Sequence, residues 1–99
     1  VQTCALPIWL MRTELSGAKL AGANFAGADL GRALLSFADL RGANLAGANL
    51  TGVDLSGADL TGADLTNANG TEADFGDTIL KDAKGLDTVI GLKLPRSGG

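Results

Sequence analysis

Residues 38–65 read Ala-Asp-Leu-Arg-Gly, Ala-Asn-Leu-Ala-Gly, Ala-Asn-Leu-Thr-Gly, Val-Asp-Leu-Ser-Gly, Ala-Asp-Leu-Thr-Gly and Ala-Asp-Leu. Each unit has a small apolar residue, Asp or Asn, Leu, a mostly small residue and Gly. The pattern extends, with interruptions, over most of the 99-residue chain. The repeat therefore decides the architecture, and nothing in it is a reactive side chain that would indicate catalysis.

A period of five residues suits neither an α-helix nor a straight strand. On a helix, successive Leu residues would step about 140° around the axis, so that no apolar stripe would form. On a straight strand, an odd period sends alternate Leu residues to opposite faces. The pattern is satisfied if the chain bends at each Gly, which tolerates positive φ. Leu and the Ala two residues before it then point inward, and Asp or Asn points outward.

Such a chain is predicted to form a solenoid with a continuous core. Its repeat resembles the Ala-(Asp/Asn)-Leu-X-X consensus of pentapeptide-repeat proteins, densely from residue 15 to residue 80. The resemblance implies an all-β solenoid, a right-handed quadrilateral β-helix with about twenty residues per coil and about three to four coils. The family's central position corresponds to Leu15, Leu20, Phe25, Leu30, Leu35, Leu40, Leu45, Leu50, Leu55, Leu60, Leu65, Phe75 and Leu80.

The sequence outside the repeat divides the chain into further segments. We expect residues 1–12 to be an irregular lead-in; residues 1–8 resemble the translation of a sequencing-adapter end, and the alternative is a genuine segment covering the core. Residues 13–82 are the predicted β-helix, and residues 83–94 a C-terminal cap with a short helical or 3₁₀ turn near residues 87–90. Residues 95–99 are a loose tail. The whole is one domain at most, complete or a fragment of a larger protein.

One central position in the repeat, Gly70, has no side chain. We expect the core beside Leu50 to be underfilled there, with Phe75 leaning in to compensate. Restoring the missing side chain by Gly70→Leu is then expected to add apolar burial of about 1.5–3 kcal/mol. The alternative is a tight turn at Gly70 or a space already filled by neighbours, in which case Leu would be overpacked.

The composition excludes several classes of function. The chain has no His and a single Cys, so a catalytic triad with His, a zinc site built on His or several Cys, and an intramolecular disulfide framework are all excluded. A net charge of −3 argues against direct binding of nucleic acid, and no apolar run is long enough to span a membrane. We predict no enzymatic activity, no cofactor, no metal, and a cytoplasmic location in a bacterium.

Asp residues recur at outward positions, and residues twenty apart are expected to stack at about the 4.8 Å spacing of paired strands. This would place Asp39 over Asp59 on one side, and Asp54 over Asp74 on the adjoining side. They are either ordinary solvated residues or an acidic strip for a basic partner. The resemblance implies the second through family members that protect DNA gyrase by mimicking duplex DNA. Three basic residues interrupt the strip here: Arg32, Arg41 and Lys81.

Two large apolar residues, Leu34 and Phe37, also occupy outward positions of the repeat. The local interpretation is that Phe37 folds over a groove left by small neighbours. The functional interpretation is a contact patch, because large apolar residues exposed side by side are unusual.

We therefore predict a non-catalytic structural or protein-interaction module with an unidentified protein partner. The alternative is an acidic DNA mimic that binds DNA gyrase or another topoisomerase, which would need a continuous negative face along the rod. The predicted partner contacts are Leu34, Phe37, Asp39, Asp54, Asp59 and Asp74.

Overall fold

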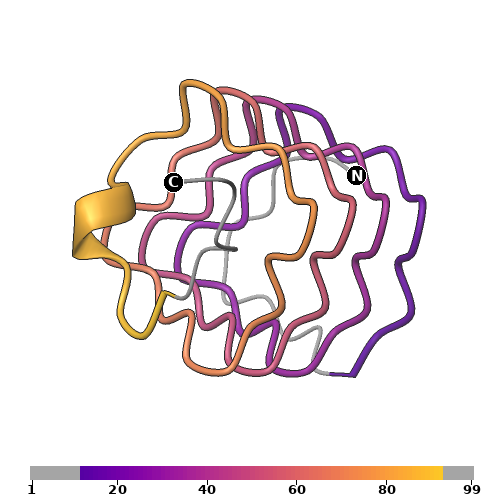
Figure 1. Cartoon of the computed structure of the whole chain (residues 1–99), viewed down its shortest axis with the longest axis horizontal. Coiled ribbons are helices and arrows are strands. Elements are labelled where there is room, and N and C mark those ends of the chain that lie inside the picture. Colours follow the sequence, from indigo (N-terminus) through magenta and orange to yellow (C-terminus); the bar gives the residue numbers. More distant parts are fainter. Residues whose placement is uncertain (1–11, 93–99) are drawn as a thin grey trace.

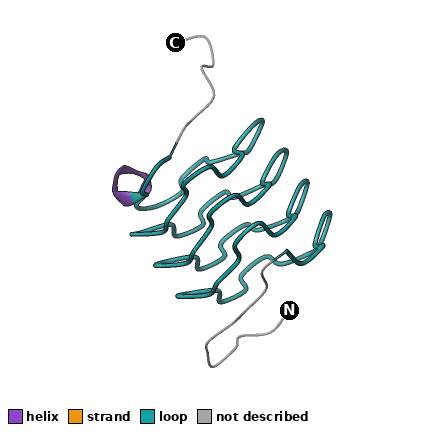
Figure 2. Ribbon diagram, turned by 90° about the horizontal axis from the view of Figure 1, so that it is seen from below, coloured by secondary structure: helices purple, strands orange, loops and turns teal. Residues whose placement is uncertain are grey.

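The computed structural model describes residues 12–92, which wind into a stack of coils (Figure 1). Parallel backbone bridges join residues twenty positions apart along the stack, from Glu14–Leu34 to Asp64–Lys84. A two-residue turn recurs every five residues, so each coil of twenty residues has four short sides. The bridges are therefore single residue pairs rather than continuous strands, and Figure 2 shows the coils in register from another direction.

The same hydrogen bonds recur in each unit of the regular repeat. The Leu40 N–H donates to Asp59 O in the next coil at 2.8 Å, and the Asp59 N–H donates back to Ala38 O at 3.0 Å. The Ala43 N–H donates to Leu40 O at 3.0 Å and closes the turn between two sides. Neighbouring coils thus satisfy the backbone groups that a side of five residues cannot satisfy alone.

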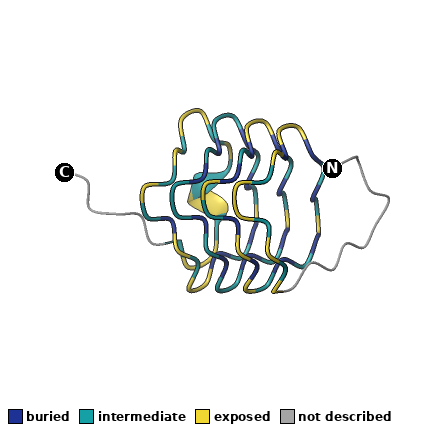
Figure 3. Ribbon diagram, turned by 90° about the vertical axis from the view of Figure 1, so that its right-hand side faces the viewer, coloured by how far each residue is buried: buried dark blue, intermediate teal, exposed yellow. Residues whose placement is uncertain are grey.

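The core consists of the two apolar positions of the repeat (Figure 3). Ala48, Leu50 and Val53 are fully buried, as are their equivalents through the regular coils. No polar or charged residue is buried within residues 12–92. The alternation that places Leu and Ala inside and Asp or Asn outside is as the sequence indicates. Burial of each Leu contributes about 1.5–3 kcal/mol, which drives the chain to bend at every unit.

The C-terminal part of the described chain contains a 3₁₀ helix, η1 (Leu86–Thr88), at the edge of the last coil (Figure 1). It overlaps the short turn predicted near residues 87–90. The Thr88 hydroxyl accepts the Asn67 N–H at 2.8 Å and donates to Gly85 O at 2.6 Å. Ile90 then bridges to Asn69, twenty-one residues away, so the segment absorbs one extra residue and rejoins the ladder.

The expectation of an underfilled core at Gly70 is wrong. A methyl group at Gly70 would lie 3.1 Å from Val89 Cγ1 and 3.5 Å from Phe75 Cε2, so both side chains already occupy the space. The Gly70 N–H donates to Ile90 O at 2.7 Å, and the residue does not have positive φ. The extra residue in the η1 segment brings Val89 against this position, in place of the missing Leu.

The predicted lead-in (1–12) and tail (95–99) fall almost wholly outside the described residues, as do the adapter-like residues 1–8 and the end of the predicted cap. The division of the chain into these segments stays a prediction.

Candidate protein-interaction surface

Each corner of a coil is a β-turn whose third residue has positive φ. Gly42 illustrates the regular case, with φ 68°. This backbone region disfavours L residues with a Cβ by about 1–2 kcal/mol. Seven non-glycine residues within the described chain nevertheless adopt it, with φ between 57° and 60°: Arg12, Arg32, Phe37, Asn67, Glu72, Asp77 and Asp82. Core packing and the ladder therefore impose the corner conformation even where the residue resists it.

Phe37 is a bulky aromatic residue held in this conformation, with φ 59°. Its N–H still donates to Ser56 O at 2.9 Å, so the ladder is intact. A methyl group at Gly57 would lie 2.5 Å from Phe37 Cε1, which places the ring over the equivalent corner of the next coil. The ring thus folds over a small neighbour, yet 75% of Phe37 remains exposed.

Leu34 lies three residues before Phe37 and is 40% exposed. Bridges place it between Glu14 in the preceding coil and Asp54 in the next, and Asp54 in turn bridges Asp74. We call these four outward residues the Leu34 column, and Leu34 with Phe37 the apolar corner. The apolar corner therefore lies in a column whose other three residues are acidic.

The carboxylates of the Leu34 column bond only to nearby backbone and hydroxyl groups. Asp54 Oδ1 accepts the Ser56 N–H at 3.0 Å and the Ser56 hydroxyl at 2.6 Å. Asp74 Oδ1 accepts the Gly76 N–H at 2.8 Å. Hydrogen bonds from Ser16 lower the pKa of Glu14. Within residues 12–92 none of the three forms an ion pair with Lys or Arg, so their negative charge is not neutralised locally.

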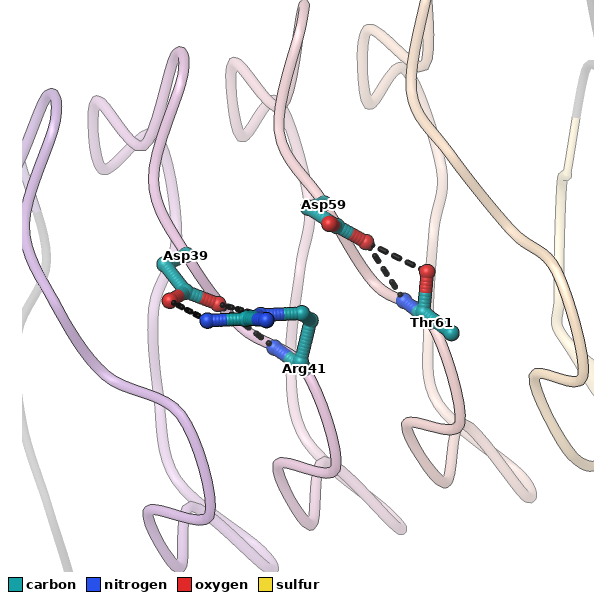
Figure 4. A network of polar contacts seen from close by, with 4 residues as sticks. All are labelled: Asp39, Arg41, Asp59 and Thr61. Atoms are coloured by element: carbon teal, nitrogen blue, oxygen red, sulfur yellow. Dashed lines mark hydrogen bonds and ion pairs between the residues drawn. The ribbon is translucent and has the colours of Figure 1, made fainter.

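The adjoining side carries the Asp39 column: Lys19, Asp39, Asp59 and Ile79. The Arg41 guanidinium forms two bonds to Asp39, Nε to Oδ1 at 2.8 Å and Nη2 to Oδ2 at 2.6 Å (Figure 4). The Arg41 side-chain bond is the main reason that the pKa of Asp39 falls to about 2. Asp59 Oδ1 accepts the Thr61 hydroxyl and N–H, and these bonds lower its pKa. Positive charge therefore accompanies the acidic residues of this side.

The structure gathers the six predicted contact residues onto two adjoining sides of the solenoid. Leu34, Asp54 and Asp74 stand in the Leu34 column, Asp39 and Asp59 in the Asp39 column, and Phe37 at the corner between them. The two predicted Asp stacks are present as bridged pairs. Sequence reasoning omitted Glu14 and Asp77, although the twenty-residue register points to both: Glu14 precedes Leu34 by one coil, and Asp77 follows Phe37 by two.

No group of three or more His, Cys, Asp or Glu side chains in the described part of the chain could hold a metal ion. Within residues 12–92 the only helix is η1, whose three residues are too short to cross a membrane.

Stacked coils of a five-residue unit, with Leu and Ala inside, define a repeat solenoid. The chain belongs to the pentapeptide-repeat family: the family model "Pentapeptide repeats" matches residues 13–52 and 48–84, in eight copies. Among curated protein sequences, none matches this chain.

Solved structures of pentapeptide-repeat proteins have the same fold. One from the Arabidopsis thaliana thylakoid lumen is 42% identical over 76% of this chain and 52% of its own, with a TM-score of 0.73. One from Nostoc is 38% identical over 88% of this chain and 77% of its own, with a TM-score of 0.77. The chain thus spans about half the length of the Arabidopsis protein.

Proposed function

We propose that this protein is a non-catalytic interaction module, a right-handed quadrilateral β-helix that binds a protein partner through the apolar corner and the acidic residues beside it. The observation that carries the proposal is Phe37, which is 75% exposed and held at a positive φ. Its contact set is Leu34, Phe37, Asp39, Asp54, Asp59 and Asp74.

Folding alone gives no reason for an exposed Phe at this corner. Gly satisfies the same backbone position at Gly42 without the steric penalty, and Asp or Asn occupies the position of Leu34 in most other units. Strained residues and adjacent exposed apolar side chains are each associated with functional surfaces. Here the two features coincide within four residues, on a scaffold whose neighbouring coils are joined by a regular ladder of backbone hydrogen bonds.

The acidic DNA mimic, directed at DNA gyrase or another topoisomerase, stays a prediction, as does the cytoplasmic location. Two observations count against the mimic. Leu34 interrupts the charge of its own column, and Arg41 pairs with Asp39 on the adjoining side. A DNA mimic requires a continuous negative face that neither side provides.

A peptide-display selection tests the interaction module. A random twelve-residue library is selected on the parent protein, and the enriched peptides are then measured against the double variant Leu34→Asn/Phe37→Gly. This variant restores the repeat consensus at both positions, so we expect it to remain folded and to melt no lower than the parent. We expect the affinity of the enriched peptides to fall by at least about tenfold, since the contact loses two apolar side chains.

The control is Leu45→Ala, which weakens the buried core far from the apolar corner. Peptides that bind the core-weakened variant but not the consensus variant would locate the contact at the apolar corner. Enriched peptides that bind both variants like the parent, or a failure to enrich any peptide on the parent, would contradict the proposal.

A further inference from the structure

We propose that the partner segment is an extended peptide that carries an apolar side chain flanked by Lys or Arg. This inference rests on the proposed function and specifies its partner. The apolar side chain would pack on the apolar corner, and the basic residues would pair with the carboxylates of the Leu34 column.

The two sides that meet at Phe37 differ in how their carboxylates are balanced. On the Asp39 column, Arg41 takes both oxygens of Asp39. On the Leu34 column, the local bonds of Asp54 and Asp74 all go to Oδ1, and within residues 12–92 neither has a basic partner. Each therefore keeps Oδ2 for an external donor. Charge-assisted bonds of this kind give an interface orientation and specificity as well as energy.

Acidic residues without a basic partner lie above and below the apolar corner on the described surface, while Arg32 lies at the other end of the same side. Glu14 precedes Leu34 in its column, and Asp54 and Asp74 follow it. Asp77 occupies the corner two coils after Phe37, beyond Gly57. On the protein, an apolar centre is flanked by acidic residues. A partner with an apolar side chain flanked by basic residues complements it, as in ordinary interfaces, which have an apolar centre and a polar periphery.

The spacing along the column suits a peptide that runs parallel to the solenoid axis. Stacked residues in successive coils are about 4.8 Å apart, and same-face residues of an extended peptide about 6.6–6.8 Å apart. If an apolar residue of the peptide packs on Leu34 and Phe37, the next residue on the same face of the peptide lies between Asp54 and Asp74. The flexible side chains of Lys and Arg span the remaining offset. Anionic surfaces, whether nucleic acid or phospholipid headgroups, would be repelled by the same carboxylates.

Three labelled peptides of equal length test the inference by fluorescence anisotropy with the whole protein. The first has Lys two residues before and two residues after each Leu or Phe, with Ser between them, so that the basic and apolar side chains share one face of the extended peptide. The second replaces Leu and Phe by Ala, and the third replaces Lys by Glu. We expect the first to bind at least about tenfold more tightly than either of the others. Its affinity should also decrease as salt is raised, because the pairs are exposed.

Two double variants with equal charge change locate the binding. Asp54→Asn/Asp74→Asn should weaken the first peptide by at least about tenfold, whereas Asp29→Asn/Asp64→Asn, in columns outside the contact set, should change it by less than about threefold. Equal losses in the two variants would indicate binding by net charge alone and would overturn the inference.

Sedimentation of the parent protein tests whether the surface binds a second copy of the chain. If the parent self-associates and Leu34→Asn/Phe37→Gly does not, the surface belongs to a second copy, and this would likewise overturn the inference.

The two proposals can fail separately. Suppose that the Glu-containing peptide binds as tightly as the Lys-containing one, and that Phe37→Gly abolishes the binding of both. The interaction module is then supported, and the proposal of a basic partner is contradicted. If Phe37→Gly changes the affinity of no peptide, the interaction module itself is contradicted.

Discussion

The regular run at residues 38–65 and the disturbed run at residues 31–37 fold into the same corner turns with different residues. In the regular run, Gly42 has φ 68° and its N–H donates to Thr61 O at 2.8 Å. In the disturbed run, Phe37 has φ 59° and its N–H donates to Ser56 O at 2.9 Å. The turn therefore does not depend on Gly; it follows from the core positions on either side and from the ladder between coils.

This comparison separates the positions that define the fold from those that are free to vary. Inward positions in both runs hold Ala, Leu or, at residue 53, Val, and every one of them is buried. Outward and corner positions differ sharply between the runs, at a conformational cost but without loss of register. Departures from the repeat at such positions therefore reflect surface properties, and this favours the apolar corner as the candidate interface.

The largest effect should come from reversing inside and outside within the regular run. Ala48→Asp would place a carboxylate where the residue is fully buried, with an expected loss of about 4 kcal/mol or more. Asn49→Asp would lose the bond from Asn49 Nδ2 to Asp29 Oδ1, 3.1 Å long, and bring two carboxylates together, at about 1 kcal/mol. Urea unfolding of the two variants measures the difference, and equal midpoints would show that the inward assignment is wrong.

The next effect concerns Gly70, where the repeat has no central side chain. Gly70→Leu should destabilise the protein by about 1–3 kcal/mol, because Val89 and Phe75 already fill the position. Thermal melts of Gly70→Leu, Val89→Ala and the combined variant form a double-mutant cycle. The combined variant should recover most of the loss, since the shorter side chain at position 89 makes room for Leu. A single variant Gly70→Leu that melts above the parent would contradict the packing described here.

The interior of the repeat was predictable from sequence because a period of five leaves few alternatives. The Leu and Ala positions, the twenty-residue register and the stacked Asp pairs all follow from one unit and one bend. Gly70 was not predictable in the same way. Its neighbour Val89 lies outside the regular spacing, and only the extra residue between Asn69 and Ile90, absorbed near η1, brings it into place.

The surface was predictable in part. The outward positions of Leu34 and Phe37 follow from register, as does the alignment of Asp54 with Asp74. The pairing of Arg41 with Asp39 does not, because it depends on the rotamer of a long side chain two residues away. Sequence shows which charges are present on a side, and the geometry shows which of them are already neutralised.

Exchanging the corner residues of the two runs should shift stability in opposite directions. Phe37→Gly relieves the left-handed strain and should stabilise the protein by about 1 kcal/mol, although it loses the ring contact with Gly57. Gly47→Ala introduces the strain at φ 68°, where the added methyl group meets no neighbour, and should destabilise by about 1 kcal/mol.

Phe37→Ala is the control for the strain itself, because it removes the ring but keeps the Cβ. It should melt below Phe37→Gly in a thermal scan. If the Ala and Gly variants melt together, positive φ has no energetic consequence at this corner, and strain no longer supports its functional assignment.

The smallest effect tests the charge difference between the two sides through Asp39. Its pKa is lowered to about 2, mainly by the Arg41 side-chain bond, against an ordinary value of 3.8. A carboxyl whose pKa is lower in the folded state stabilises that state above pH 3.8, and the contribution disappears as pH falls toward 2.

Arg41→Ala should therefore raise the pKa of Asp39 toward its ordinary value in a carboxyl NMR titration, although the bond from the backbone N–H of residue 41 remains. The parent should melt above this variant at about pH 5, and the difference should shrink as the pH approaches 2. Asp64 serves as the internal reference, because its lowered pKa depends mainly on Thr66 and should not move. An unchanged pKa of Asp39 in Arg41→Ala would mean that the two sides are equally unneutralised, and the preference for the Leu34 column would lose its electrostatic basis.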